Sequence, residues 1–192
     1  MPSFLQISDC IDVQPLKKAL ETHEHLFGAH KERAEAYGSP HTGMSDIWIR
    51  YNAYENFDKN NPAAFCAEHD SVWYPSYYAV KDQIKPILFG LMTLCEGERL
   101  GGVLITKVPP GGKVDAHIDY GWHAGYYEKI YVPVKNAPGA VFGFPEWDIH
   151  AKEGCAYWFR NDVMHWVNND SDQDRIAMVV CIKTDKFKGM RG

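Results

Sequence analysis

Three metal-binding side chains and one arginine carry the chemistry that can be inferred from this sequence. His117 and Asp119 form a His-x-Asp pair, and His165 lies further along the chain. Two imidazoles and one carboxylate can bind one face of a metal ion and leave its other positions open, which is the ligand set typical of non-haem Fe(II) oxygenases. Arg175 follows soon after His165 and offers a fixed cation on which an acidic co-substrate could dock.

The His-x-Asp pair carries little weight alone, because a chain of this composition contains roughly 0.7 such pairs by chance. Taken by itself, an ion pair on a surface strand is the simpler interpretation. The surrounding pattern favours a metal site. Alternate residues of a strand share one face, so a strand over residues 114–119 would direct His117 and Asp119 to the same side.

The second half of the sequence has the pattern of a β-protein. A turn at 109–112 precedes the strand of His117. Further strands are predicted from β-branched and aromatic content, at residues 129–134, 140–144, 155–159, 164–167 and 175–182. The polar cluster at 168–172 joins the last two, which predicts that they form a hairpin with His165 and Arg175 on neighbouring strands. Several short strands separated by Gly and Pro turns indicate a sandwich or barrel, and a jelly roll has an open mouth for a metal and a small ligand.

Over residues 104–182 the chain resembles the Fe(II)/2-oxoglutarate-dependent oxygenase superfamily, and within it the aspartyl/asparaginyl β-hydroxylase-like branch. The residues that carry the resemblance are PGGKVDAHIDYG at 110–121, KIYVPV at 129–134 and HWVNNDSDQDR at 165–175. The last segment is the most specific of the three. The resemblance implies a mainly β fold with flanking helices, a double-stranded β-helix of the jelly-roll, cupin-like type.

The resemblance also implies roles for individual residues. His117, Asp119 and His165 would bind Fe(II), and Arg175 would hold the distal carboxylate of the co-substrate 2-oxoglutarate. The family often has Arg and His where this chain has Lys129 and Tyr131. These two share a strand face, and both a secondary co-substrate contact and an ordinary surface position stay open for Lys129.

Length and composition predict one jelly-roll oxygenase domain over residues 1–192, with an N-terminal helical region over about residues 1–98. The net charge of −5 argues against a nucleic-acid partner. We expect no membrane span and no signal peptide, and we interpret five scattered cysteines as free thiols of a cytoplasmic protein. The oligomeric state is not predicted.

Two helices are predicted from apolar periodicity. One covers residues 12–27, with Pro15 in its first turn and Leu16, Leu20 and Phe27 on one side. The other covers residues 76–98, with a break or kink near Pro86, and its apolar side would cover the sheet. A strand is expected at 46–51, and a loop with a short helix at 56–70.

Several other residues are candidates for the pocket. Trp122 and Tyr126 are expected as pocket walls, although core packing is the common role of aromatic residues. Arg50 could contact an acidic substrate group, but an exposed strand position is the simpler interpretation. The remaining histidines, His41 and His123 among them, are interpreted as ordinary surface or hydrogen-bonded groups; His150 is a possible pocket residue without support from its spacing.

The sequence predicts an Fe(II)- and 2-oxoglutarate-dependent dioxygenase that uses O2 to hydroxylate an amino-acid side chain, free or in a polypeptide. Two alternatives stay open. One is a cupin-like metalloenzyme that does not use 2-oxoglutarate. The other is a non-catalytic jelly roll that binds a small ligand or a partner.

Overall fold

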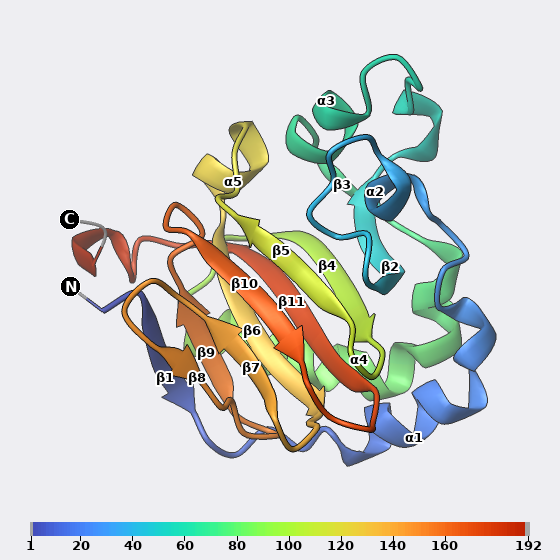
Figure 1. Cartoon of the computed structure of the whole chain (residues 1–192). Helices are drawn as coiled ribbons and strands as arrows, with labels where there is room; N and C mark the ends of the chain where they lie inside the picture. The colour runs from blue at the N-terminus through green and yellow to red at the C-terminus, as the bar shows by residue number, and fades with distance from the viewer. Residues whose placement is uncertain (1, 191–192) are drawn as a thin grey trace.

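Two antiparallel sheets face each other in the computed structural model, which describes residues 2–190 (Figure 1). The large sheet has the order β1-β9-β6-β11-β4-β2-β3 and the small sheet has the order β5-β10-β7-β8. The large sheet consists of β1 Phe4–Ser8, β9 Ala156–Phe159, β6 Glu128–Lys135, β11 Arg175–Lys183, β4 Arg99–Val108, β2 Ser45–Asn52 and β3 Ser71–Trp73. The small sheet consists of β5 Lys113–His117, β10 His165–Asn169, β7 Ala140–Gly143 and β8 Asp148–Ile149.

Helices α1 and α4 cover the face of the large sheet that points away from the small one. The α-helices are α1 Gln14–Thr22, α2 Glu32–Glu35, α3 Pro62–Ala67, α4 Pro75–Leu94 and α5 Trp122–Tyr126, and 3-10 turns occur at Glu24–Leu26, Tyr54–Asn56 and Lys188–Met190. Leu16 and Leu20 of α1 and Ile84 and Leu91 of α4 are buried against the sheet. This packing explains their helical spacing, because residues three or four apart share one side of a helix.

A second core lies between the two sheets and is largely aromatic. It contains Tyr131, Phe142, Phe144, Tyr157 and Phe159, whose rings contact one another in tilted and stacked pairs. Two facing antiparallel sheets with this core are the double-stranded β-helix that the sequence predicts.

The predicted hairpin between the last two strands is wrong, because β10 and β11 lie in opposite sheets. β10 pairs with β5 and β7, whereas β11 pairs with β4 and β6. The turn between them is fixed by Asn169, whose side-chain amide donates to the backbone carbonyls of Val108, Pro109 and Gln173. A polar turn that crosses between sheets has the same composition as a hairpin turn, so composition could not distinguish the two.

The other predicted strands are confirmed, with small changes at their ends. The predicted helices are also present, but the first ends at Thr22, before the 3-10 turn. The non-helical residue of α4 is Val80, with φ −125° and ψ 16°, and the helix continues through Pro86, where the sequence predicts the break. Strands β1, β3, β4 and β8 and helices α2 and α5 are additions that the sequence pattern does not predict.

The region over about residues 1–98, predicted to be helical with one strand at 46–51, contains more strand than expected. Residues 1–98 include β1, β2 and β3, all of which belong to the large sheet. The five cysteines are free thiols, as predicted. Among residues 2–190, no helix combines the length and apolar character that a bilayer crossing requires.

Gly143 offers a test of how tightly the small sheet packs. It lies opposite Trp166 in the β7–β10 pairing, and a Cβ atom at this position would overlap the indole ring. We expect Gly143→Ala to lower the free energy of unfolding by about 1–3 kcal/mol, measured by urea denaturation. Gly90→Ala is the control, because this exposed helical position has nothing within 4 Å and the change should be neutral or stabilising. Equal stability of the two variants would contradict the close packing.

Candidate metal centre

The pairing of β5 with β10 brings the two metal-binding histidines together. His117, the last residue of β5, lies opposite His165, the first residue of β10, and their ring centroids are 4.4 Å apart. The register shifts between this pair and the next, Val167 with Val114, so β5 contains one extra residue. A bulge of this kind re-aims the side chains that come after it. Here it lets Val114, which is buried, and His117 both line the same cavity.

Asp119 reaches the site from outside the strand. β5 ends at His117, and the backbone N–H of Asp119 donates to the carbonyl of Asn161 at 2.9 Å. The expectation that His117 and Asp119 share a side is confirmed, but the strand predicted over 114–119 ends two residues early. Asp119 is therefore held by the segment that leads into β10 and not by strand alternation.

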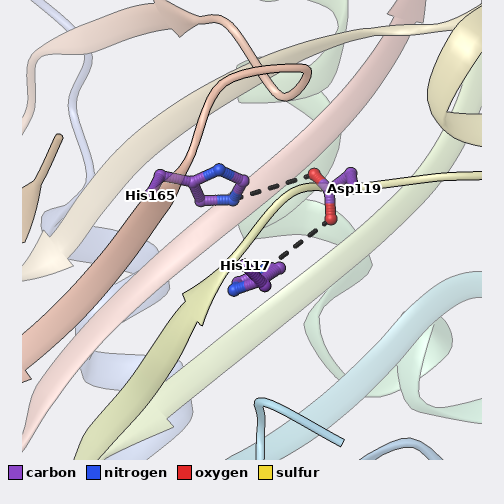
Figure 2. A group of neighbouring side chains, drawn as sticks. All are labelled: His117, Asp119 and His165. Carbon is purple, nitrogen blue, oxygen red and sulfur yellow. Dashed lines mark ion pairs between the residues drawn. The ribbon is translucent and has the colours of Figure 1, made fainter. Parts of the chain in front are cut away.

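The three side chains converge on one point, as Figure 2 shows. The Nε2 atom of His117 lies 3.7 Å from Oδ1 of Asp119, and Nε2 of His165 lies 3.8 Å from Oδ2. One ligand atom from each residue lies within 4.8 Å of the other two. Bonds of about 2.1 Å to one ion place adjacent ligand atoms roughly 3–3.5 Å apart, so a small inward movement would complete the site.

Backbone carbonyls fix the orientation of both imidazole rings. Nδ1 of His117 lies 2.7 Å from the carbonyl of Asp115, and Nδ1 of His165 lies 2.9 Å from the carbonyl of Val163. A carbonyl oxygen only accepts, so each Nδ1 carries the hydrogen and each Nε2 presents a lone pair. This is the arrangement in which metal-ligating histidines are commonly held.

The charge states also fit a divalent cation. Burial lowers the pKa of His165 to about 4 and also lowers the pKa of His117, so both rings are neutral near pH 7. Burial opposes ionisation of Asp119, but Lys129 and the two histidines outweigh it and lower its pKa to about 2. Neutral imidazole and ionised carboxylate are the forms that bind metal. The donor set therefore fits Fe(II).

Lys129 and Tyr131 lie on one face of β6 and both reach the same cavity. The ammonium group of Lys129 lies 2.5 Å from Oδ2 of Asp119. The guanidinium of Arg175 donates to the Tyr131 hydroxyl at 2.5 Å and also lies over the Tyr131 ring. Although β10 and β11 do not pair, Arg175 thus lines the cavity that His165 lines.

Arg175 is a buried cation that has no carboxylate partner within the described range 2–190. Only 4% of its surface is exposed, and it forms no ion pair with any of these residues. A buried guanidinium is costly unless an anion accompanies it. This position can therefore receive an anionic ligand.

All six predicted site residues line one cavity of about 580 Å³. The structure adds Arg33, His41, His69 and His123 to the lining. His41 and His123 are hydrogen-bonded groups as expected, to Arg33 and to the backbone N–H of Gly102, but they also line the cavity. These residues come from α2, from loops and from α5, where no spacing pattern in the sequence relates them to the triad. In the sequence, only their residue types marked them as candidates for the cavity.

The other residues considered for the pocket lie outside the cavity lining. Trp122 and Tyr126 stack on each other with centroids 4.9 Å apart and do not line the cavity. The five-residue helix α5 directs them away from it, which an aromatic pattern alone could not show. Arg50 donates to the carbonyls of Gly101 and Ser71, a structural role, and His150 does not line the cavity.

Comparison with known proteins supports the fold. No family model matches the sequence, and no curated protein matches it. Among solved structures, it is similar to a prolyl hydroxylase from Trichoplax adhaerens in complex with a hypoxia inducible factor oxygen degradation domain peptide fragment. The identity is 11%, the match covers 99% of this chain and 87% of that chain, and the TM-score is 0.55.

It is also similar to the viral collagen prolyl hydroxylase of Paramecium Bursaria Chlorella virus-1 in its 2-oxoglutarate complex. The identity is 12%, the match covers 95% of this chain and 97% of that chain, and the TM-score is 0.52. At these identities the likeness shows a shared fold. The chain is a double-stranded β-helix protein with a candidate His-Asp-His metal centre; the aspartyl/asparaginyl branch stays a prediction.

Removal of one ligand tests the metal centre. We expect Asp119→Ala to weaken Mn(II) binding, measured by calorimetry as a surrogate for Fe(II), by more than about 100-fold, because even indirect supporting contacts are worth 10- to 100-fold. Asp115→Ala is the matched control. Asp115 is exposed and pairs with Lys113, and its backbone carbonyl, which holds His117, is retained. Unchanged Mn(II) affinity in Asp119→Ala would sink the assignment.

Proposed function

We propose that this chain is an Fe(II)- and 2-oxoglutarate-dependent dioxygenase that hydroxylates an amino-acid side chain, free or in a polypeptide. In this reaction 2-oxoglutarate is decarboxylated to succinate. The observation that carries the proposal is the buried guanidinium of Arg175, unpaired with any carboxylate of residues 2–190, in the same cavity as the His117, Asp119 and His165 cluster. A metal site alone fits many reactions, whereas a metal site with a dedicated anion position fits an acidic co-substrate.

The residues have separate roles in this proposal. His117, Asp119 and His165 would hold Fe(II), which supplies O2 activation and C–H oxidation when bound. Arg175 would bind the distal carboxylate of 2-oxoglutarate, and the Tyr131 hydroxyl, which accepts from Arg175, would fix the direction of the guanidinium. Phe142 and Phe159 pack around His165 and exclude water from that side.

Lys129 has a role that depends on what Asp119 binds. Its ammonium group pairs with the Asp119 carboxylate. Once that carboxylate binds a cation, the ammonium is free to contact a second anionic group nearby, such as the other carboxylate of 2-oxoglutarate. This secondary contact is part of the proposal.

The two similar hydroxylases, one with 2-oxoglutarate and one with a peptide fragment, support the co-substrate and a peptidyl or small-molecule substrate.

The anion position can be tested separately from the metal. We expect Arg175→Met to raise the apparent 2-oxoglutarate requirement about 10- to 100-fold, since a charge-assisted contact is lost. Arg175→Lys should recover only part of it, because an ammonium cannot form the bidentate pair. Tyr131→Phe, which keeps the cation, should have a smaller effect. Wild-type 2-oxoglutarate affinity in Arg175→Met would move the co-substrate role to Lys129.

The reaction class is tested by product analysis. The protein with Fe(II), O2 and 2-oxoglutarate should form succinate slowly, and faster with free amino acids or with peptides containing Asp and Asn. A hydroxylated product gains one oxygen atom, about 16 mass units, which mass spectrometry detects. Metal binding without succinate would favour a cupin-like enzyme that does not use 2-oxoglutarate. Neither metal binding nor succinate would favour a non-catalytic binding protein.

A further inference from the structure

Arg33 is a second guanidinium in the cavity, besides that of Arg175, and its surroundings hold it in one orientation. It lies on α2, and its Nη1 atom donates to Oδ2 of Asp46 at 2.7 Å. The Asp46 side chain is 2% exposed and the Arg33 side chain 17%, so the carboxylate is the more deeply buried partner. On another edge, Nη2 lies 2.9 Å from Nε2 of His41. Since a guanidinium only donates, His41 accepts this bond.

The segment that carries His41 is fixed to the strand of the metal ligand. The backbone N–H of Asp115, in the bulge of β5, donates to the carbonyl of Pro40 at 2.8 Å. The His41 ring meets the His117 ring edge-on, with centroids 4.9 Å apart. Arg33 is therefore tied through His41 to a position beside His117.

The donors of Arg33 are only partly used by the protein. A guanidinium has five N–H groups; Nη1 donates to Asp46, and Nη2 lies 2.9 Å from Nε2 and 3.2 Å from Nδ1 of His41. The remaining donors belong to a side chain that lines the cavity. The guanidinium is planar, and a buried carboxylate fixes its orientation. Its remaining donors are therefore suited to bidentate binding of a second carboxylate.

The rest of the outer cavity lacks a partner for a cationic substrate group. The acidic residues in its described lining are Asp115 and Asp119. Asp115 is exposed and pairs with Lys113, and Asp119 belongs to the metal cluster. The described lining therefore offers a substrate a fixed cation, Arg33. Apart from Asp119 of the metal cluster, its one carboxylate is that of Asp115, which lies at the surface and is already paired.

A second observation, at another lining residue, indicates that the cavity is built to bind a polar ligand. His69 is 6% exposed and lines the cavity, and its Nε2 atom has no hydrogen-bond partner within the described residues. Its ring lies 4.8 Å from the ring of Tyr51, which also lines the cavity. A buried nitrogen without a partner is costly, so its place beside a cavity points to a ligand that supplies the missing bond.

We propose that Arg33 is the docking cation for a carboxylate group of the substrate, a second anion position in the cavity besides that of Arg175. This rests on the proposed function, because it assigns a role in substrate recognition. The carboxylate has two possible sources. It is either the α-carboxylate of a free amino acid or an acidic side chain of a peptide, and both present the same group to the guanidinium.

The test variant removes the buried pair as a unit. Arg33→Met alone would leave Asp46 buried without a counter-charge, so the double variant Arg33→Met/Asp46→Leu replaces both with apolar residues of similar size. Arg33→Lys is the second variant, which retains the charge and Asp46 but lacks the planar fork. The matched control is Lys17→Met/Glu153→Gln, which removes an ion pair of 2.9 Å whose residues do not line the cavity.

Binding is measured by calorimetry, without turnover, in the presence of N-oxalylglycine to occupy the position of Arg175. Three probes separate the sources: L-asparagine, which has only the α-carboxylate; N-acetyl-L-aspartic acid α-amide, which has only the side-chain carboxylate; and N-acetyl-L-asparagine amide, which has none. We expect the wild-type protein to bind at least one of the carboxylate probes more tightly than the neutral one. The double variant should lose about 10- to 100-fold for that probe, and Arg33→Lys less.

Each result has a defined meaning. Preference for L-asparagine assigns the α-carboxylate of a free amino acid, and preference for the aspartyl amide assigns a peptide side chain; both support the proposal. It is overturned if no probe binds, if the neutral probe binds equally well, if the control loses as much, or if only Arg175→Met loses affinity. A chain that forms no succinate but binds a carboxylate through Arg33 would refute only the proposed reaction.

Discussion

The antiparallel pairing of β5 with β10 is the contact on which the candidate metal centre depends. It places His117 opposite His165 at the end of the small sheet, and the extra residue in β5 directs His117 into the cavity. A shift of one residue in this register would move a ligand to the opposite face of its strand. The N–H of Asp115 in the bulge is paired with the Pro40 carbonyl, so the irregularity does not leave this backbone donor unpaired.

The buried charges of the cavity are governed by one physical requirement, that each cation is accompanied by an anion. Lys129 has Asp119, and Arg33 has Asp46. Arg175 contacts the phenol of Tyr131, which is neutral because burial raises its pKa even though the adjacent guanidinium opposes the shift. The unmet requirement is therefore local to Arg175, whereas in the proposed function a metal ion on Asp119 would compete with Lys129 for the carboxylate. That competition would link metal binding to the binding of an acidic ligand.

The parts of the site that lie on regular strands could be predicted from the sequence. Lys129 and Tyr131 share a face because strand alternation holds along β6. Asp119 is predicted on the correct side for the wrong reason, since the strand ends at His117 and the Asn161 carbonyl holds the Asp119 backbone. The prediction of a hairpin between β10 and β11 is wrong, because the amino-acid composition of a turn indicates that the chain bends but not which sheet the next strand joins. Arg33 and His69 escape prediction because long-range packing of short segments, which has no periodic signal, brings them to the cavity.

The two parts of the chain contribute differently to the cavity. The strands β5, β6, β10 and β11 provide the two metal-binding histidines, Lys129 and Arg175, all on backbone fixed by paired neighbours. The outer wall comes from segments of the N-terminal half, which are anchored to the second half through separate bonds. Pro40 accepts from the β5 backbone, and Glu68 accepts a bond from the Trp122 N–H at 3.0 Å. Because these anchors are separate from the metal ligands, changes in the outer segments can alter which substrate fits while the metal site is retained. If the proposed function holds, the strands would carry the reaction and the N-terminal segments would contribute to the choice of substrate.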